Sequence, residues 1–183
     1  FKCENGKTGV LLIIASIPAV IIGYFFQSFF ENIFDSLLVI GFGFGITGLF
    51  LFIASLDFRQ KKKKLGYFDS FLIGIAQAIS ILPGISRSGA TISSGILLGL
   101  DARAAARFSF LMSVPIIFGA NILVIGNQTL PSDLIWATLV AFLVGLGTMH
   151  FLFKVVLTKK ENLRWFGIYA LLLALGIFSY LVF

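Results

Sequence analysis

The sequence predicts an all-α, polytopic membrane protein of the inverted-repeat type, with about five spanning helices and a re-entrant helical hairpin. Three observations predict this fold. Hydrophobic residues make up 58% of the 183-residue chain and charged residues only 12%, with a mean hydropathy of +1.03. Five apolar stretches are long enough to cross the hydrocarbon core, which takes about 20 residues. Two further apolar segments are too short to cross it.

The predicted spans are the five long apolar stretches of the chain. They cover residues 9–30, 37–56, 104–126, 134–157 and 165–183. A soluble domain of this length needs far more charged residues to cover its surface. Residues 1–183 are therefore predicted to form a single integral membrane domain.

The charge and cysteine content exclude two other classes of protein. The net charge of +6 would suggest a nucleic-acid partner in a soluble protein, but in a membrane protein basic residues gather in cytoplasmic loops. We therefore expect no nucleic acid as a partner. The single Cys3 excludes an internal disulfide and offers no metal cluster.

The two short apolar segments, 68–82 and 90–100, are separated by the sequence that begins at Pro83 and ends at Gly89. Proline and glycine both interrupt helices, so a turn is expected between the segments. Non-helical backbone at membrane depth is tolerated only where protein or a wet cavity surrounds it. This turn is therefore the place where a binding site is expected.

The basic residues predict that both ends of this hairpin lie on one side of the membrane. Arg59 and Lys61–Lys64 form the densest basic cluster, which is expected in the cytoplasm. Counting crossings back from Lys159 places Arg103 on the cytoplasmic side as well. Residues 65–103 thus enter and leave on the same face.

Arg87 lies in this turn and is costly to place in an apolar environment, by about 2.5 kcal/mol or more. It is therefore expected to have an anionic partner, and its planar guanidinium is suited to bidentate phosphate binding. The structural alternative is an arginine that pairs with helix C-terminal carbonyls or with Asp69. Asp69 is itself expected to cap the entering helix.

The residues around Arg87 are of kinds that bind phosphate. Glycines let backbone amides approach a ligand closely, and hydroxyls supply further donors. The predicted set comprises Arg87, Ser86 and Thr91 as catalytic residues and Gln77, Gly84, Ser88 and Gly89 as substrate-binding residues. The hydroxyl residues are equally suited to capping the helix that starts near Ala90, and a helix N-terminus itself binds anions. Gln77 is almost as well suited to joining two helices.

Three other patterns carry less chemistry. Residues 43–48 read G-x-G-x-x-G, but they lie inside an apolar span, so close helix packing is the better interpretation. Ser16-Ile17-Pro18 resembles Ser113-Val114-Pro115, which is a loose sign of internal duplication. His150 has no neighbouring histidine or cysteine in the sequence and is interpreted as structural or interfacial.

Residues 77–92, QAISILPGISRSGATI, resemble the signature of the bacterial undecaprenyl-diphosphate phosphatases, the bacitracin-resistance family. Residues 15–23 and 106–120 are also similar to that family. The resemblance implies a plasma-membrane enzyme that removes the terminal phosphate of undecaprenyl diphosphate and so recycles the lipid carrier of cell-wall synthesis. It also implies interdigitated inverted repeats, two re-entrant hairpins and a site open toward the periplasm.

The resemblance further implies roles and partners. Arg87 would hold the diphosphate, with Ser86 and Thr91 beside it. A divalent cation, Mg²⁺ or Ca²⁺, is expected of the family. The expected partners are the polyprenyl diphosphate lipid, the membrane and, in a homodimer, a second copy of the chain.

One family motif, with two glutamates and a histidine, has no match here. Glu4, Glu31 and Glu161 lie near span ends, and His150 is in the wrong half of the chain. Ligands for the cation are therefore not expected in this chain, which resembles the family without its N-terminal third and begins without methionine. The alternatives to a phosphatase are a transporter of lipid diphosphate or another anion, and an inactive fragment that only binds lipid phosphate.

Overall fold

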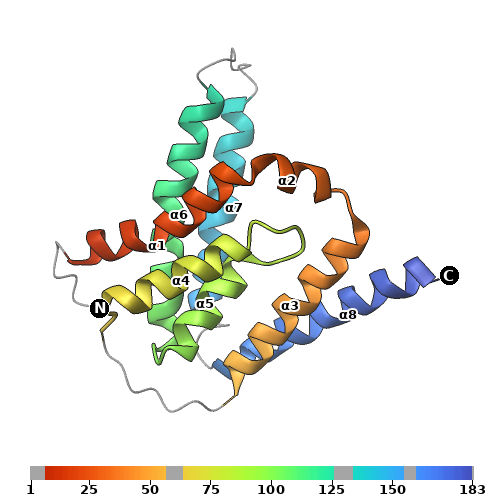
Figure 1. Ribbon diagram of the computed structural model, residues 1–183. Coiled ribbons are helices and arrows are strands. Elements are labelled where there is room, and N and C mark those ends of the chain that lie inside the picture. Colours follow the sequence, from red (N-terminus) through yellow and green to blue (C-terminus); the bar gives the residue numbers. More distant parts are fainter. Residues whose placement is uncertain (1–6, 57–63, 126–133, 155–159, 183) are drawn as a thin grey trace.

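The computed structural model describes residues 7–56, 64–125, 134–154 and 160–182, and these ranges are helical apart from short turns (Figure 1). The helices are α1 (Lys7–Phe25), α2 (Gln27–Ile33), α3 (Leu37–Ser55), α4 (Tyr67–Ile79), α5 (Arg87–Leu97), α6 (Ala102–Ile125), α7 (Leu134–Lys154) and α8 (Leu163–Val182), with a 3₁₀ turn at Lys160–Asn162. Among them α1, α3, α6, α7 and α8 are long and apolar enough to cross a membrane. The predicted polytopic helical fold is confirmed.

The first predicted span, 9–30, is wrong at its C-terminal end. The helix ends at Phe25, and Phe26 leaves helical geometry with φ −112° and ψ 18° before α2 begins at Gln27. No proline or glycine lies at this break, and the polar pair Gln27-Ser28 that follows it is flanked by phenylalanines on both sides. Hydropathy therefore did not indicate where the span ends.

The hairpin of α4 and α5 lies at the centre of the helix packing. Helix α4 packs along α1, whereas α5 contacts α3, α4 and α6, and α3 packs along α8 (Figure 1). Gly74 of α4 approaches the backbone of Ala15 of α1 so closely that a Cβ atom there would overlap the Ala15 carbonyl oxygen. The α5 helix is thus held on three sides.

The two ends of the hairpin lie together at one end of the molecule. Leu65, just before α4, packs against a buried cluster that includes Leu100, Ala102 and Leu163. Leu65 also packs against the neighbouring cluster of Leu11 and four other buried residues. Whether the hairpin enters the membrane and leaves on the same side stays a prediction, because Arg59, Lys61–Lys63 and Lys159 lie outside the described residues.

Aspartate side chains cap two of these helices, one of them the predicted cap Asp69. Asp69 Oδ2 accepts a hydrogen bond from the Gly66 amide at 3.0 Å and so caps α4. Asp101 Oδ2 accepts one from the Arg103 amide at 3.1 Å and caps α6. Asp69 therefore lies at the end of α4 that is remote from Arg87.

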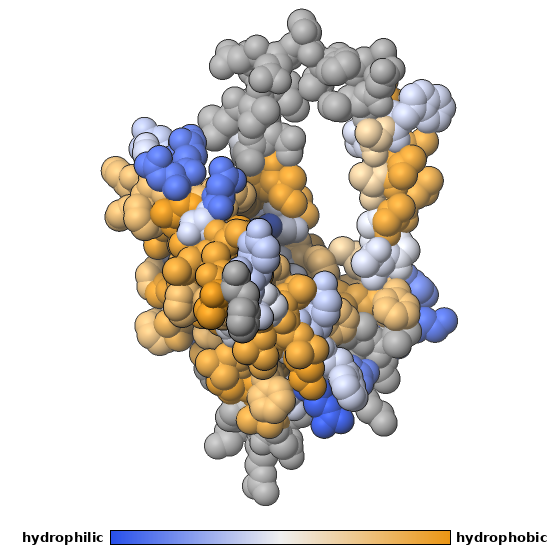
Figure 2. Space-filling model, turned by 90° about the vertical axis from the view of Figure 1, so that its right-hand side faces the viewer, coloured by the Kyte–Doolittle hydropathy of each residue, from blue (hydrophilic) through white to orange (hydrophobic). Residues whose placement is uncertain are grey.

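Helix α7 stands apart from the other helices. The window of α7 from Ile135 to Lys154 has no buried residue. Its last turn is the part that packs against described residues, where Leu152 and Phe153 contact the buried cluster around Leu100. Figure 2 shows the resulting wide opening between α7 and the rest of the molecule.

Candidate active site at the turn between α4 and α5

The turn between α4 and α5 is pressed against the N-terminal half of α3. Gly84 has φ +85°, a conformation that glycine adopts without strain. A Cβ atom on Gly84 would overlap the carbonyl oxygen of Ile40, and one on Gly43 would overlap that of Pro83. These two glycines therefore let the turn and α3 approach backbone to backbone.

The same glycine pattern, residues 43–48, sets the distance between α3 and α8. A Cβ atom on Gly48 would lie 2.6 Å from Leu171 Cγ and 2.8 Å from the carbonyl oxygen of Gly167. The interpretation of this pattern as close packing is confirmed. One face of α3 positions the turn, and the other packs on α8.

Thr47 joins α3 to the turn by two hydrogen bonds. Its Oγ1 accepts from the backbone amide of Ser86 at 2.9 Å and donates to the carbonyl oxygen of Gly84 at 3.3 Å. Thr47 is 4% exposed, so these bonds form away from water, where they are strongest. Sequence reasoning missed this residue, because its partners lie 39 and 37 positions away along the chain.

Ser86 is the N-cap of α5. Its backbone is extended, with φ −68° and ψ 115°, and its Oγ accepts from the Gly89 amide at 3.1 Å. The Ser88 hydroxyl lies 3.5 Å from Ser86 Oγ and is exposed. The helix begins at Arg87 and not near Ala90, so Ser86 is the hydroxyl residue that caps it, whereas Ser88 and Thr91 lie inside its first turns. The backbone amides of Arg87 and Ser88 come before the first hydrogen bond within the helix.

Arg87 is the first residue of α5 and is held by a neutral partner. Its Nε and Nη2 donate to Gln77 Oε1 at 3.1 and 2.7 Å, and Nη2 also lies 3.4 Å from the carbonyl oxygen of Met112. Within the described part of the chain Arg87 has no carboxylate partner, and pairing with Asp69 is excluded by the position of that residue. No described carboxylate therefore neutralises the guanidinium, whose hydrogen bonds go to the Gln77 side-chain oxygen and the Met112 carbonyl.

Gln77 lies behind Arg87 on α4. Its side chain is 2% exposed, and its Nε2 is buried with no hydrogen-bond partner among the described residues. Its Oε1 orients Arg87, so the structure gives it a positioning role. Direct contact of Gln77 with substrate stays a prediction.

Thr91 lies one turn into α5 and faces α6. It is 1% exposed, and its Oγ1 lies 2.8 Å from the carbonyl oxygen of Arg87 and 2.6 Å from Ser109 Oγ. Its hydroxyl therefore joins the first turn of α5 to α6. Sequence reasoning did not single out Ser109, and a catalytic role for Thr91 stays a prediction.

The predicted residues thus occupy two layers. Ser86, Arg87 and Ser88 lie at the accessible tip of the turn, and Gly84 bends the chain toward them. Gln77, Gly89 and Thr91 lie behind them and are buried. The tip presents a guanidinium, two hydroxyls and first-turn amides, which together are suited to bind a phosphate group.

The described residues do not fit a divalent cation at this turn. Mg²⁺ and Ca²⁺ prefer carboxylate and carbonyl oxygens. No group of three or more histidine, cysteine, aspartate or glutamate side chains occurs in the part of the chain that the structure describes. No step of the chemistry is therefore derived through a metal.

The comparisons with known proteins concern the family to which the whole chain belongs. Residues 2–176 match the family described as "Bacitracin resistance protein BacA". The chain is 40% identical over 172 residues to the undecaprenyl-diphosphatase of Methanococcus vannielii, covering 93% of this chain and 68% of that protein. It is 43% identical over 186 residues to the undecaprenyl-diphosphatase of Christiangramia forsetii, covering 97% and 69%.

A third relative is covered almost completely. The chain is 39% identical over 175 residues to the undecaprenyl-diphosphatase of Methanothermobacter thermautotrophicus, which covers 91% of this chain and 96% of that protein. The family match extends across every described helix except the end of α8. The chain is a polytopic membrane protein that belongs to the bacitracin resistance protein family.

Proposed function

We propose that this protein hydrolyses undecaprenyl diphosphate to undecaprenyl phosphate and inorganic phosphate, which recycles the lipid carrier of cell-wall synthesis. Relatives named undecaprenyl-diphosphatase at 39–43% identity support the substrate and the reaction. The proposal rests on one structural observation above all. Arg87 stands at the first turn of α5 with a neutral side-chain partner, Gln77, so that its charge is directed to a ligand.

In the proposed reaction an oxygen of water attacks the terminal phosphorus. The bond from that phosphorus to the bridging oxygen breaks, and the bridging oxygen leaves with undecaprenyl phosphate. The two protons of the water stay on the inorganic phosphate or pass to solvent. Arg87 and the first-turn amides of α5 stabilise the negative charge on the transferred phosphoryl group and on the leaving oxygen. They are set in place before the reaction by Gln77, Thr47 and the Ser86 cap.

Ser86 is held as a cap rather than activated as a nucleophile. Its oxygen accepts from the Gly89 amide, and its other neighbour is the Ser88 hydroxyl, which is no base. A serine nucleophile needs a general base within hydrogen-bond reach. The described contacts give Ser86 no base, so the proposal takes water as the attacking group.

The cation, the orientation and the oligomeric state are parts of the proposal that rest on the family resemblance. A divalent cation of the family would take its ligands from outside the described residues. The turn would open to the periplasm, on the side of the plasma membrane opposite the basic loops. A homodimer remains compatible with this arrangement.

A transporter is not favoured, because the relatives are named for hydrolysis. The test is phosphate release from undecaprenyl diphosphate by the purified 183-residue chain, with and without added Mg²⁺ or Ca²⁺. Release that Arg87→Ala abolishes and Arg164→Gln leaves intact supports the proposal. Near-normal release by Arg87→Ala contradicts it, as does uptake of the lipid diphosphate without cleavage.

A further inference from the structure

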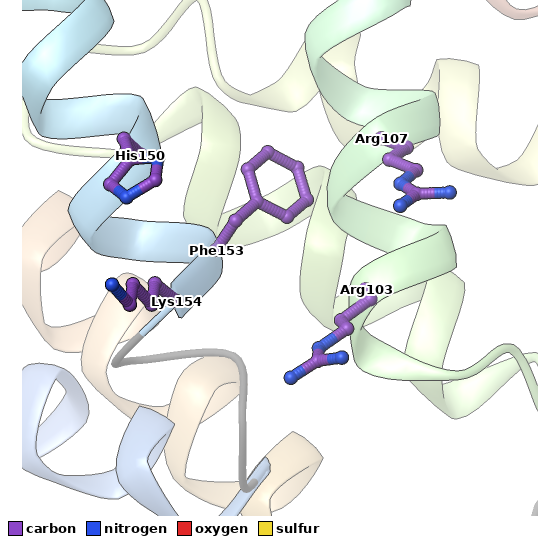
Figure 3. Close-up of a pocket in the computed structure, with 5 residues that line it drawn as sticks. All are labelled: Arg103, Arg107, His150, Phe153 and Lys154. Carbon is purple, nitrogen blue, oxygen red and sulfur yellow. The ribbon is translucent and has the colours of Figure 1, made fainter.

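A pocket lies between α6 and α7, and none of its lining residues belongs to the α4–α5 hairpin. The cavity measures about 430 Å³ and is lined by Arg103, Arg107, His150, Phe153 and Lys154. Figure 3 shows the two arginines on α6, with His150 and Lys154 on α7 and the Phe153 ring between the helices. Three of the five residues are formally cationic and none is acidic, so the pocket is electropositive.

The helical repeat explains why these basic residues gather. Arg103 and Arg107 are four residues apart on α6, and His150 and Lys154 are four residues apart on α7. Side chains four apart share one face of a helix. Phe153 joins the two faces, because its ring lies 5.8 Å from that of Phe110 on α6. Each helix thus contributes two nitrogen-bearing side chains to one cavity.

The position of the pocket at the ends of two candidate spanning helices is where lipid headgroups are expected. Both of its walls are spanning helices, and the pocket is at the first turns of α6, which begins at Ala102, and the last turns of α7, which ends at Lys154. Basic pockets between spanning helices bind the headgroups of anionic lipids on the cytoplasmic side. The charge pattern predicts that side for these residues.

The surroundings of the pocket are apolar along the length of the helices. On α6 Leu111, Val114 and Phe118 are exposed, and their spacing places them on the same helical face as Arg107. On α7 Leu143 and Leu146 are exposed. A free phosphate ion makes no use of such surfaces, whereas acyl chains bury apolar area against them. The pocket is basic and the opening between α6 and α7 that extends from it is apolar, so together they fit an amphipathic ligand.

We propose that this pocket binds the phosphate-bearing headgroup of an anionic membrane lipid through Arg103, Arg107 and Lys154. The acyl chains of that lipid lie in the opening between α6 and α7. The lipid joins α7 to the rest of the molecule where protein contacts are few. The proposal is independent of hydrolysis at Arg87, because it concerns other residues and another ligand.

The test is lipid retention by the purified 183-residue chain, measured by native mass spectrometry. The protein is taken from phosphatidylcholine nanodiscs that contain a minor share of phosphatidylglycerol. Wild type should retain phosphatidylglycerol selectively, and Arg103→Gln/Arg107→Gln should retain at least about tenfold less, since each basic group near the surface contributes about fivefold. Arg164→Gln is the matched control, because Arg164 is an exposed arginine that lies over the Trp165 ring and does not line the pocket.

A competition arm identifies the source of the phosphate group. Inorganic phosphate in large excess should leave phosphatidylglycerol bound. Displacement by inorganic phosphate would overturn the lipid assignment in favour of a free-phosphate site. Equal retention of both lipids, or equal retention by the double variant and wild type, would overturn the site itself. Dimers that exclude lipid, with cross-links from α7 to a second copy, would assign the opening to protein instead.

The melting temperature of the double variant in phosphatidylcholine alone checks that it is folded. It should match that of Arg164→Gln there, because the removed charges lie on the surface of the pocket. Addition of phosphatidylglycerol should then raise the melting temperature of wild type and of Arg164→Gln but not that of the double variant. A rise of the same size in the double variant would contradict the proposal.

Discussion

The side-chain oxygen of Gln77 accepts two hydrogen bonds from the guanidinium of Arg87, at 3.1 Å from Nε and 2.7 Å from Nη2. An uncharged acceptor fixes the direction of the arginine without neutralising it. A carboxylate in the same place would hold the arginine as firmly but would compete with phosphate for its charge. This pair is therefore the relationship on which the proposed phosphate site depends.

Replacement of Arg87 should remove most of the activity. Removal of one charge-stabilising donor from an active site lowers kcat by about 10²–10³-fold. Arg87→Ala should reach or exceed this loss, and Arg87→Lys should recover only part of it, because the ammonium lacks the planar fork that meets Gln77 and a phosphate together. Phosphate release from undecaprenyl diphosphate measures both variants. Full activity of Arg87→Lys would show that charge alone suffices.

Replacement of Gln77 tests its positioning role. Gln77→Met keeps the volume but removes the acceptor, and Gln77→Glu keeps the acceptor but adds a charge. We expect Gln77→Met to lower kcat by about 10–100-fold through misplacement of Arg87. Gln77→Glu should instead raise KM for the anionic substrate, because the carboxylate occupies the guanidinium. If Gln77→Met and Gln77→Glu change kcat by the same factor and KM by the same factor, the positioning role is contradicted.

Replacement of Thr47 should lower stability as well as activity. Thr47→Val is nearly isosteric but leaves the Ser86 amide and the Gly84 carbonyl without their hydroxyl partner. A buried polar group without its partner costs about 1–3 kcal/mol. Thermal unfolding in detergent measures the change. Thr148→Val is the matched control, because the Thr148 hydroxyl donates to the Val144 carbonyl within exposed α7, so that variant should melt within about one degree of wild type.

A comparison of a tightly packed glycine, Gly84, with an open one, Gly176, tests the packing of the turn. Gly84→Ala places a methyl group against the Ile40 carbonyl at a φ of +85°, so we expect a loss of at least about 2 kcal/mol. Gly176→Ala meets nothing within 4 Å in α8 and should be neutral or stabilising. Unfolding curves of the two variants, measured side by side, decide the matter. A stable Gly84→Ala protein would mean that the turn does not lie against α3.

Thr91 offers a test that separates packing from catalysis. Its hydroxyl and that of Ser109 lie 2.6 Å apart between α5 and α6. If Thr91 acts through this contact, Thr91→Val and Ser109→Ala should reduce stability and activity together, and the double variant should lose less than the sum of the two. A Thr91→Val protein of normal stability with no activity would instead place its hydroxyl on the substrate.

The local chemistry of the turn was predictable from sequence, whereas its supports were not. Pro83, Gly84 and Ser86 act on their own neighbours, through a helix stop, a positive φ and a cap, and each is visible in a few consecutive letters. Thr47 and Ser109 meet the turn from other helices. The glycine pattern that contains Thr47 predicts close helix packing but no bond to the turn, and Ser109 lies in an ordinary apolar stretch. Contacts so distant along the chain depend on how the helices pack.

The spanning helices were likewise predictable in number but not in where each one ends or what it packs against. Composition predicted five spanning helices, because the cost of burying charge in lipid acts on every residue of a span. The break at Phe26 has no proline or glycine beside it, and the polar pair Gln27-Ser28 is too short a signal to end a span that resumes with Phe29 and Phe30. The sequence also did not predict that α7 packs against so little of the described protein, because a helix that faces lipid and a helix that faces protein are both apolar.

The neutral partner of Arg87 has a consequence for the resting protein. A cation that is half-buried among neutral groups makes the empty site less stable than the occupied one, so an anion that binds there raises the temperature of unfolding by mass action. Inhibitors of this site can thus be ranked by thermal shift without any turnover assay. The ranking should follow the number of charges on the phosphate group and vanish in Arg87→Ala. The uncompensated charge of Arg87 that attracts an anion therefore also makes the bound anion stabilise the fold against heat.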